Sequence, residues 1–193
     1  MNKARLEAFS DGVLAIIITI MVLEIKVPHE AGWASIKPLL SVLYSYILSY
    51  LFVGIYWVNH HHLLHTVKKV TGKILWANLH FLFWLSLTPV ATGWMGENHF
   101  ATNTVVVYAI LLLLCGVGYT VLEATIRQSN IHNTAFEDAF KSLRRKGKIS
   151  IIIYVSSIPL AYINTAISGL LFLVVAILWL IPERKIEKAI GEE

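Results

Sequence analysis

Residues 11–24 read DGVLAIIITIMVLE: twelve residues, apolar except at Gly12 and Thr19, stand between two carboxylates. At about 1.5 Å per residue, a helix of this length spans roughly 18 Å, well short of the roughly 30 Å hydrocarbon core of a bilayer. A lone lipid-facing helix with acidic ends would be poorly matched, because carboxylates are too short to reach the interface. The apolar residues also surround the helix instead of forming one stripe. We therefore expect the first span to lie inside the protein, with water at both ends.

The composition of the whole chain indicates an integral membrane protein. Of its 193 residues, 56% are hydrophobic and 15% are charged, and the mean hydropathy is +0.66. A soluble domain of this length cannot bury so much apolar surface, so lipid must be part of its solvent. No small-residue cleavage site follows the first apolar stretch, so we expect that stretch to be retained.

Six apolar stretches divide the chain into candidate spans. They are residues 10–26, 38–59, 74–95, 104–126, 149–163 and 166–181. Pro159, Asn164 and Gly169 interrupt the last apolar region, which favours a hairpin of two short helices over one long helix. Residues 127–148 are polar and are predicted to form a cytoplasmic connector carrying a short amphipathic helix. We predict a single all-α transmembrane domain over residues 1–193.

The distribution of lysine and arginine orients these spans. With six spans, fourteen basic residues lie on the side of the two termini and only Lys26 and Lys37 lie on the opposite side. Because basic residues are retained on the cytoplasmic face, both termini are predicted to be cytoplasmic in a multi-pass protein of the cell membrane. The basic segment SLRRKGK (142–148) is then a juxtamembrane cluster beside anionic lipid. We expect no nucleic-acid partner.

One stripe of the first helix carries branched aliphatic side chains. Ile16, Ile20 and Leu23 are spaced i, i+4 and i+7, and Thr19 lies beside them. Such a stripe is typical of ordinary helix packing. It equally suits the wall of a narrow pore, because stacked rings of branched aliphatics close a path by dewetting it. The spacing leaves both interpretations open.

A motif directly before this helix resembles that of a known family. Arg5, Phe9, Ser10 and Asp11 form the pattern R-x-x-x-F-S-D. Three further blocks extend the similarity: GIYWVNHHHL (54–63), LWANLHFLFWLSLTP (75–89) and LWLIPERKIEK (178–188). Together they resemble the transmembrane protein 175 family of potassium channels, in its bacterial single-repeat branch, over essentially the whole chain.

The resemblance implies a potassium-permeable channel. Its subunit would have six transmembrane helices and assemble as a homotetramer around central, pore-lining first helices, without a TVGYG filter. By position, Ile16 would form the constriction, Ile20 and Leu23 would form further rings, and Thr19 would be linked to selectivity. Since apolar walls cannot replace an ion's hydration shell, we expect modest selectivity for K+ over other monovalent cations. K+ is the permeant ion, and no cofactor is expected.

The charged residues of the motif need partners, because Arg5 and Asp11 lie on different faces of one helix. Polar candidates on the second and third spans are Asn59, His60, His61, Asn78 and His80. We predict a network that holds the first helix in register, and Trp57 and Trp76 are candidates for bracing it. The alternative for Ser10 or Asp11 is a simple helix N-cap.

The run HHHLLH (60–65) raises a metal hypothesis, since His61 and His65 share a helix face. No carboxylate joins them at ligand spacing, so we expect interfacial or network histidines, with pH sensing as an alternative and no metal. The alternative function is a proton- or cation-coupled secondary transporter. Against it, the sequence has no inverted repeat and no charged residue at mid-membrane. A histidine-box enzyme is more distant, and we expect no enzymatic activity.

Overall fold

Helices account for all the regular secondary structure in the part of the chain that the structure describes. The structure is a computed structural model that describes residues 2–129 and 134–180, without the side chains of 134–139. In chain order the elements are α1 (Lys3–Leu23), the 3₁₀-helix η1 (Trp33–Leu39), α2 (Leu40–His65), α3 (Gly72–Ser86), α4 (Thr88–Glu97), α5 (Thr102–Ser129), α6 (Thr134–Ala161) and α7 (Thr165–Leu180). The all-α prediction is confirmed.

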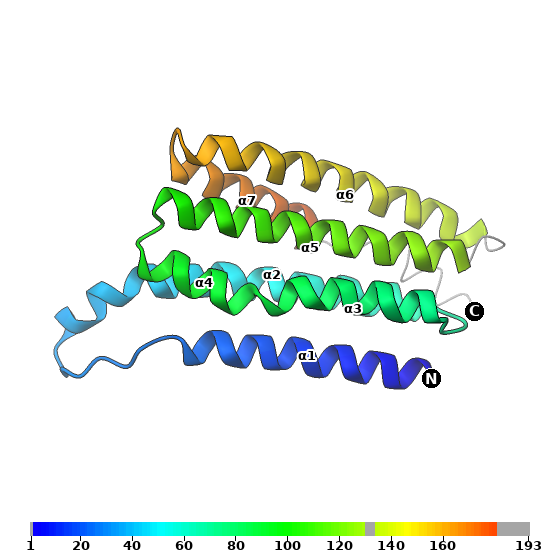
Figure 1. The fold of residues 1–193 in the computed structure, drawn as a ribbon, viewed down its shortest axis with the longest axis horizontal. Helices are drawn as coiled ribbons and strands as arrows, with labels where there is room; N and C mark the ends of the chain where they lie inside the picture. Colours follow the sequence, from blue (N-terminus) through cyan, green and yellow to red (C-terminus); the bar gives the residue numbers. More distant parts are fainter. Residues whose placement is uncertain (1, 130–133, 181–193) are drawn as a thin grey trace.

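These elements lie side by side in one elongated bundle (Figure 1). The 3₁₀-helix η1 leads directly into α2. α4 continues α3 after a break at Leu87, where Pro89 removes a backbone donor from the ladder. α1 runs along one edge of the bundle, and α6 and α7 run along the opposite edge. α1 packs on α2, α3 and α4 of its own chain.

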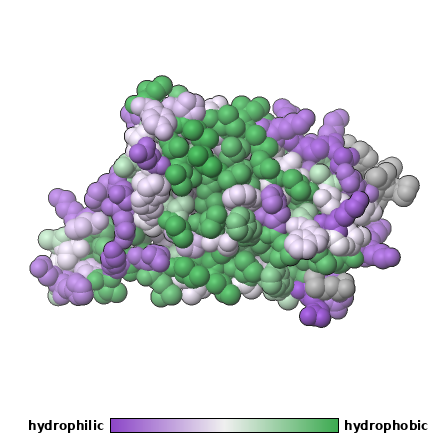
Figure 2. Space-filling view, in the orientation of Figure 1, coloured by the Kyte–Doolittle hydropathy of each residue, from purple (hydrophilic) through white to green (hydrophobic). Residues whose placement is uncertain are grey.

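The surface of the bundle suits a membrane. Four helical segments among the described residues are long and apolar enough to cross a bilayer, namely Lys3–Leu23, Trp33–His65, Gly72–Glu97 and Thr102–Ser129. Thr165–Leu180 is apolar but shorter. Apolar residues cover the middle of the molecule and hydrophilic residues gather toward its two ends (Figure 2). The exposed apolar belt therefore needs lipid or partner subunits as its solvent.

The first helix differs from its sequence-based description. It begins at Lys3, where the prediction placed the start at residue 10, so its 21 residues span about 31 Å. The Asn2 side chain caps it by accepting the backbone N–H of Arg5 at 3.0 Å. The alternative that Ser10 or Asp11 is the N-cap is therefore wrong. The helix is longer than predicted, because residues 3–9, which include three charged side chains, are also part of it.

Within one chain, α1 is not central. One face is buried against its neighbours and the opposite face is exposed, so it is packed on one side only. The expectation of a helix enclosed by protein therefore depends on further copies of the chain, because a helix at the edge of a bundle has no second layer over its outer face. The outer face of α1 is left to lipid or to another copy of the chain.

The predicted polar connector over 127–148 is mostly helical. α5 continues to Ser129 and α6 already begins at Thr134. Phe140 and Leu143 are buried, so the amphipathic pattern is stabilised by packing of α6 on α5. α6 and α7 form a hairpin around Asn164, whose side chain accepts the backbone N–H of Ala166 at 2.8 Å. The prediction of two short helices is wrong for the first arm of this hairpin, which is the 28-residue helix α6. Pro159 lies in its last turn and does not end it.

Small residues set the closest approaches between helices. An added Cβ at Gly96 of α4 would collide with the Ser45 side chain and lie 2.8 Å from the Val42 Cα of α2. At Gly118 of α5, a Cβ would lie 3.1 Å from the Phe81 Cα of α3. These glycines let the backbones pack at short range, as small residues commonly do between membrane helices.

Candidate functional site: the outer face of the first helix

The aliphatic stripe of α1 points away from its own chain. Ile16 is 59% exposed, Ile20 is 42% exposed and Leu23 is 76% exposed. The residues buried on the opposite face are Leu6, Ser10, Leu14, Ile17 and Met21. Ile16, Ile20 and Leu23 therefore do not belong to the core of the chain, and they are free to face lipid or further copies.

Thr19 places a hydroxyl on the same exposed face. Its Oγ1 donates to the carbonyl oxygen of Ala15 at 2.8 Å, so its proton is directed along the helix. The lone pairs of the oxygen remain available to accept hydrogen bonds or to coordinate a cation. Thr19 thus adds one hydroxyl to a stripe whose other side chains, those of Ile16, Ile20 and Leu23, are aliphatic.

Arg5 and Phe9 extend this stripe toward the start of α1. They precede Ile16 by eleven and seven residues, which at about 100° per residue places both within about 20° of Ile16 around the helix. Phe9 is 51% exposed and Arg5 is exposed. Among the described residues, no hydrogen bond or ion pair engages the Arg5 guanidinium. Its predicted polar partner on another span is therefore not found in the part of the chain that the structure describes.

A buried chain of hydrogen bonds joins α1 to α3 and α2. Ser10 Oγ donates to the Leu6 carbonyl at 2.9 Å, and Asn78 Nδ2 donates to Ser10 Oγ at 2.9 Å. Asn78 Oδ1 lies 2.7 Å from His60 Nε2, and since an amide oxygen only accepts, His60 is the donor. Ser10, Asn78 and His60 are at most 1% exposed. Each of these groups is satisfied, as burial in an apolar environment requires.

Asp11 is joined to α2 by a different donor. Trp57 Nε1 donates to Asp11 Oδ1 at 3.0 Å. None of the five histidine and amide candidates has this role. Trp57, which was predicted as a candidate for bracing the first helix, has it through its indole N–H. A signal was available in the sequence. Trp57 precedes His60 by three residues, so once His60 faces α1, Trp57 faces it too.

Other residues singled out from the sequence lie elsewhere. Asn59 is buried on the far side of α2, where its Nδ2 donates to the carbonyl oxygens of Ile55 at 2.8 Å and Trp179 at 3.4 Å. His80 accepts from Trp84 Nε1 at 3.0 Å on the surface of α3. Trp76 is 75% exposed and does not brace α1 within the chain.

The exposed histidines at the end of α2 do not form a metal centre among the described residues. The rings of His61 and His65 lie with centroids 4.8 Å apart. No group of three or more histidine, cysteine or carboxylate side chains in the described part of the chain is placed to hold a metal ion.

Two lysines, one at the start of α1 and one just beyond its end, make contacts that the sequence did not predict. Lys3 Nζ donates to the His65 carbonyl at the end of α2 at 2.7 Å. Beyond the other end, Lys26 Nζ lies 2.6 Å from Glu97 Oε1 of α4. This hydrogen bond to a carboxylate raises the pKa of Lys26 above its ordinary value. α1 is therefore positioned at its two ends and at its middle, while its outer face stays uncovered.

Comparison with known proteins gives consistent matches. Residues 5–89 match the model of a family described as the endosomal/lysosomal potassium channel TMEM175. The chain is 53% identical over 192 residues to a potassium channel of Chryseobacterium sp. (strain P1-3), covering 100% of both chains. It is 32% identical over 131 residues to a potassium channel of Streptomyces collinus (strain DSM 40733 / Tue 365), covering 63% of this chain and 64% of the relative.

A solved structure has the same fold. It is the crystal structure of a lysosomal potassium-selective channel TMEM175 homolog from Chamaesiphon minutus. The two chains superpose with a TM-score of 0.77 and 25% sequence identity, over 92% of this chain and 95% of the other. The arrangement of helices around α1 is thus shared with a protein of known structure.

Proposed function

Because the chain belongs to the TMEM175 family, we propose that this multi-pass membrane protein is a potassium-permeable channel with a pore lined by the outer face of α1. The observation that carries the proposal is the exposure of Ile16, Ile20 and Leu23 on a helix whose other face is firmly packed. The names of the bacterial relatives, which are potassium channels, supply the ion.

The pore requires several copies of the chain. One α1 cannot enclose a path, whereas four copies related by a rotation axis would bring four identical faces together. The proposed assembly is a homotetramer in which each subunit contributes six transmembrane helices and one quarter of the wall. In it, α1 becomes central, and its exposed aliphatic side chains become covered by their symmetry mates.

The proposed constriction is hydrophobic. Rings of Ile16, Ile20 and Leu23 would close the path by excluding water when narrow, and a hydrated ion would pass when they separate. The Thr19 oxygen, with its lone pairs free, would provide the polar layer beside the constriction. This arrangement supports modest discrimination between K+ and other monovalent cations, because aliphatic walls offer no ligands that replace hydration water.

The orientation of the channel follows from the basic residues. Fourteen lysines and arginines lie on the side of the termini and two on the other, so we place both termini in the cytoplasm. The buried chain from Ser10 through Asn78 to His60 and the Asp11–Trp57 hydrogen bond would hold α1 in the rotation that directs the stripe to the axis.

The test is recording from purified protein in planar bilayers under a potassium/sodium gradient, with Ile16→Asn beside the wild type. A polar ring at the constriction retains water, so we expect a severalfold larger current in the variant. The matched control is Val22→Asn, because Val22 is also exposed on α1 but lies about 120° from Ile16 around the helix. Equal currents in Ile16→Asn, Val22→Asn and the wild type would remove the pore assignment. A secondary transporter would instead require a coupled ion for net potassium movement.

A further inference from the structure

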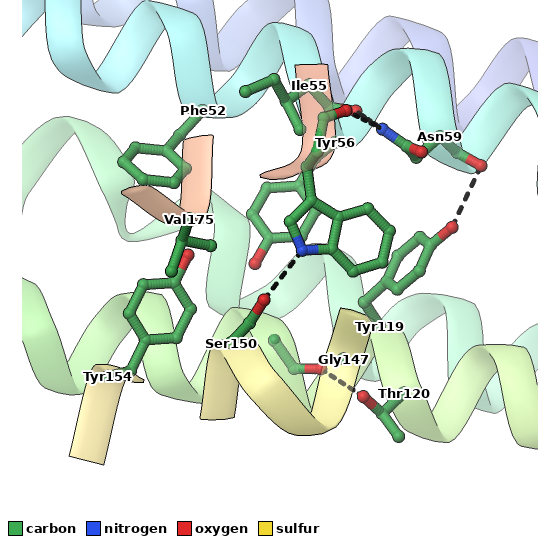
Figure 3. Close-up of a pocket in the computed structure, with 12 residues that line it drawn as sticks. Phe52, Ile55, Tyr56, Asn59, Tyr119, Thr120, Gly147, Ser150, Tyr154 and Val175 are labelled. Carbon is green, nitrogen blue, oxygen red and sulfur yellow. Dashed lines mark hydrogen bonds between the residues drawn. The ribbon is translucent and has the colours of Figure 1, made fainter. Parts of the chain in front are cut away.

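A cavity of about 30 Å³ lies between α2, α5, α6 and α7, on the side of α2 that faces away from α1 (Figure 3). Phe52 of α2 and Val175 of α7 form part of its apolar wall. Side chains with hydroxyl, amide and indole groups complete the lining, and none of the lining side chains is charged. The cavity therefore suits a neutral guest.

Most polar groups that line the cavity already have partners. Tyr119 Oη donates to the Asn59 carbonyl at 3.1 Å, Trp179 Nε1 donates to Ser150 Oγ at 2.8 Å, and Thr120 Oγ1 donates to the Gly116 carbonyl at 2.8 Å. Two hydroxyls remain, those of Tyr56 and Tyr154. Neither makes a hydrogen bond with any residue that the structure describes, although Tyr154 is only 1% exposed. A hydroxyl that lines a cavity without a protein partner can bond to water or to a guest there.

The side chains of Tyr56 and Tyr154 border the same glycine. A Cβ added to Gly116 of α5 would lie 3.7 Å from Tyr154 Cε2 and 3.9 Å from Tyr56 Oη. Figure 3 shows Tyr154 reaching from α6 and Tyr56 from α2 toward the space between the helices. One guest hydroxyl placed there can donate to one phenol and accept from the other.

We propose that this cavity is a binding site for a small neutral alcohol, with its hydroxyl between Tyr56 and Tyr154 and its carbon atoms against Phe52 and Val175. Since one water occupies about 10–15 Å³, a cavity of about 30 Å³ suits a guest of a few heavy atoms, such as methanol or ethanol. A ligand of three heavy atoms binds with a dissociation constant of about 1 mM or weaker. The site is thus a low-affinity site of sharply limited size.

The position of the cavity connects it to α1. Asn59 lines the cavity, and the next residue of α2, His60, bonds to Asn78 and through it to Ser10 of α1. An occupant that shifts α2 therefore changes the support of α1. This consequence for conduction rests on the proposed channel function, whereas binding itself does not.

Saturation-transfer NMR of ethanol with the purified protein in detergent tests the site. The decisive variant is Gly116→Ala, which adds a methyl at ordinary contact distance and fills the space. The matched control is Gly169→Ala in α7, where a Cβ has no atom within 4 Å. We expect saturable millimolar binding in the wild type and in Gly169→Ala, and at least tenfold weaker binding in Gly116→Ala. Tyr154→Phe, which keeps the ring and removes the hydroxyl, is expected to weaken binding severalfold.

Equal ethanol signals in the wild type and Gly116→Ala, or the absence of saturable binding to the wild type, would overturn the proposal and leave water as the only guest. 1-Hexanol separates the cavity from the detergent or lipid phase. It partitions more strongly into apolar phases but is too long to fit, so its signal should not respond to Gly116→Ala.

Potassium flux into proteoliposomes, measured with and without ethanol, then tests the connection to α1. We expect ethanol to change the wild-type flux and to leave that of Gly116→Ala unchanged. Absence of wild-type flux without ethanol would contradict the channel function while leaving the NMR result standing.

Discussion

Replacing Asn78 with leucine removes the central link between α1, α2 and α3 while keeping the volume of the side chain. Two interhelical hydrogen bonds are lost, from Asn78 Nδ2 to Ser10 Oγ and from His60 Nε2 to Asn78 Oδ1. Ser10 still donates to the Leu6 carbonyl, whereas the His60 donor is left buried without a partner. Two membrane hydrogen bonds at roughly 0.6–1.7 kcal/mol each give a loss of about 1–3 kcal/mol in the free energy of unfolding. Leaving the buried His60 N–H without an acceptor gives a similar loss in the free energy of unfolding.

Reversible unfolding by SDS in mixed micelles measures this loss. Asn98→Leu is the matched control, because Asn98 is exposed and its side chain donates to the Trp94 carbonyl of its own helix end, so we expect a loss of less than about 0.5 kcal/mol in the free energy of unfolding. The double variant His60→Phe/Asn78→Leu removes both members of the pair and should lose less than the sum of the two single variants. Strict additivity, or an Asn78→Leu protein as stable as the wild type, would refute the reasoning.

Two further predictions concern the pore and the helix contacts. Thr19→Val keeps the shape of the side chain but removes the hydroxyl beside the proposed constriction. The potassium/sodium permeability ratio, measured from reversal potentials, should therefore fall toward one. A ratio equal to that of the wild type would contradict the role of Thr19. Gly96→Ala forces a methyl against Ser45 and the Val42 backbone, so thermal unfolding in detergent should show a loss of about 1–3 kcal/mol in stability. Gly169→Ala, with open space around it, should show no loss. Equal stabilities of the two variants would disprove the close contact at Gly96.

The class and the helical character of this protein are already encoded in its sequence. The hydropathy of the chain and its apolar stretches separate a membrane protein from a soluble one, because burial in lipid is a property of composition that acts on each segment alone. The turn between α6 and α7 is likewise predicted by Asn164, since a turn residue acts locally. Pro159 and Gly169, the other two predicted interruptions, lie inside α6 and α7 and end neither helix. The motif from Arg5 to Asp11, with the later blocks, pointed to the family.

The first residues of α1 and α6 were predicted less well, because in both helices the hydrogen-bonded helix is longer than the apolar stretch. α1 begins at Lys3, seven residues before its predicted start, because polar residues capped by Asn2 extend the helix beyond its apolar part. α6 includes residues of the predicted connector, because Phe140 and Leu143 gain burial against neighbouring helices. A polar segment can be helical when a cap or a packed face supports it, and hydropathy does not report either.

Only the tertiary structure determined which side chains meet. Asp11 and Trp57 are 46 residues apart, and Ser10 and Asn78 are 68 residues apart. Their contacts depend on how far each helix is rotated and shifted along its axis, and small differences in packing change both without altering the periodicity. The same rotation exposes Ile16 and buries Ile17, so a uniformly apolar helix acquires an outer face only through its neighbours.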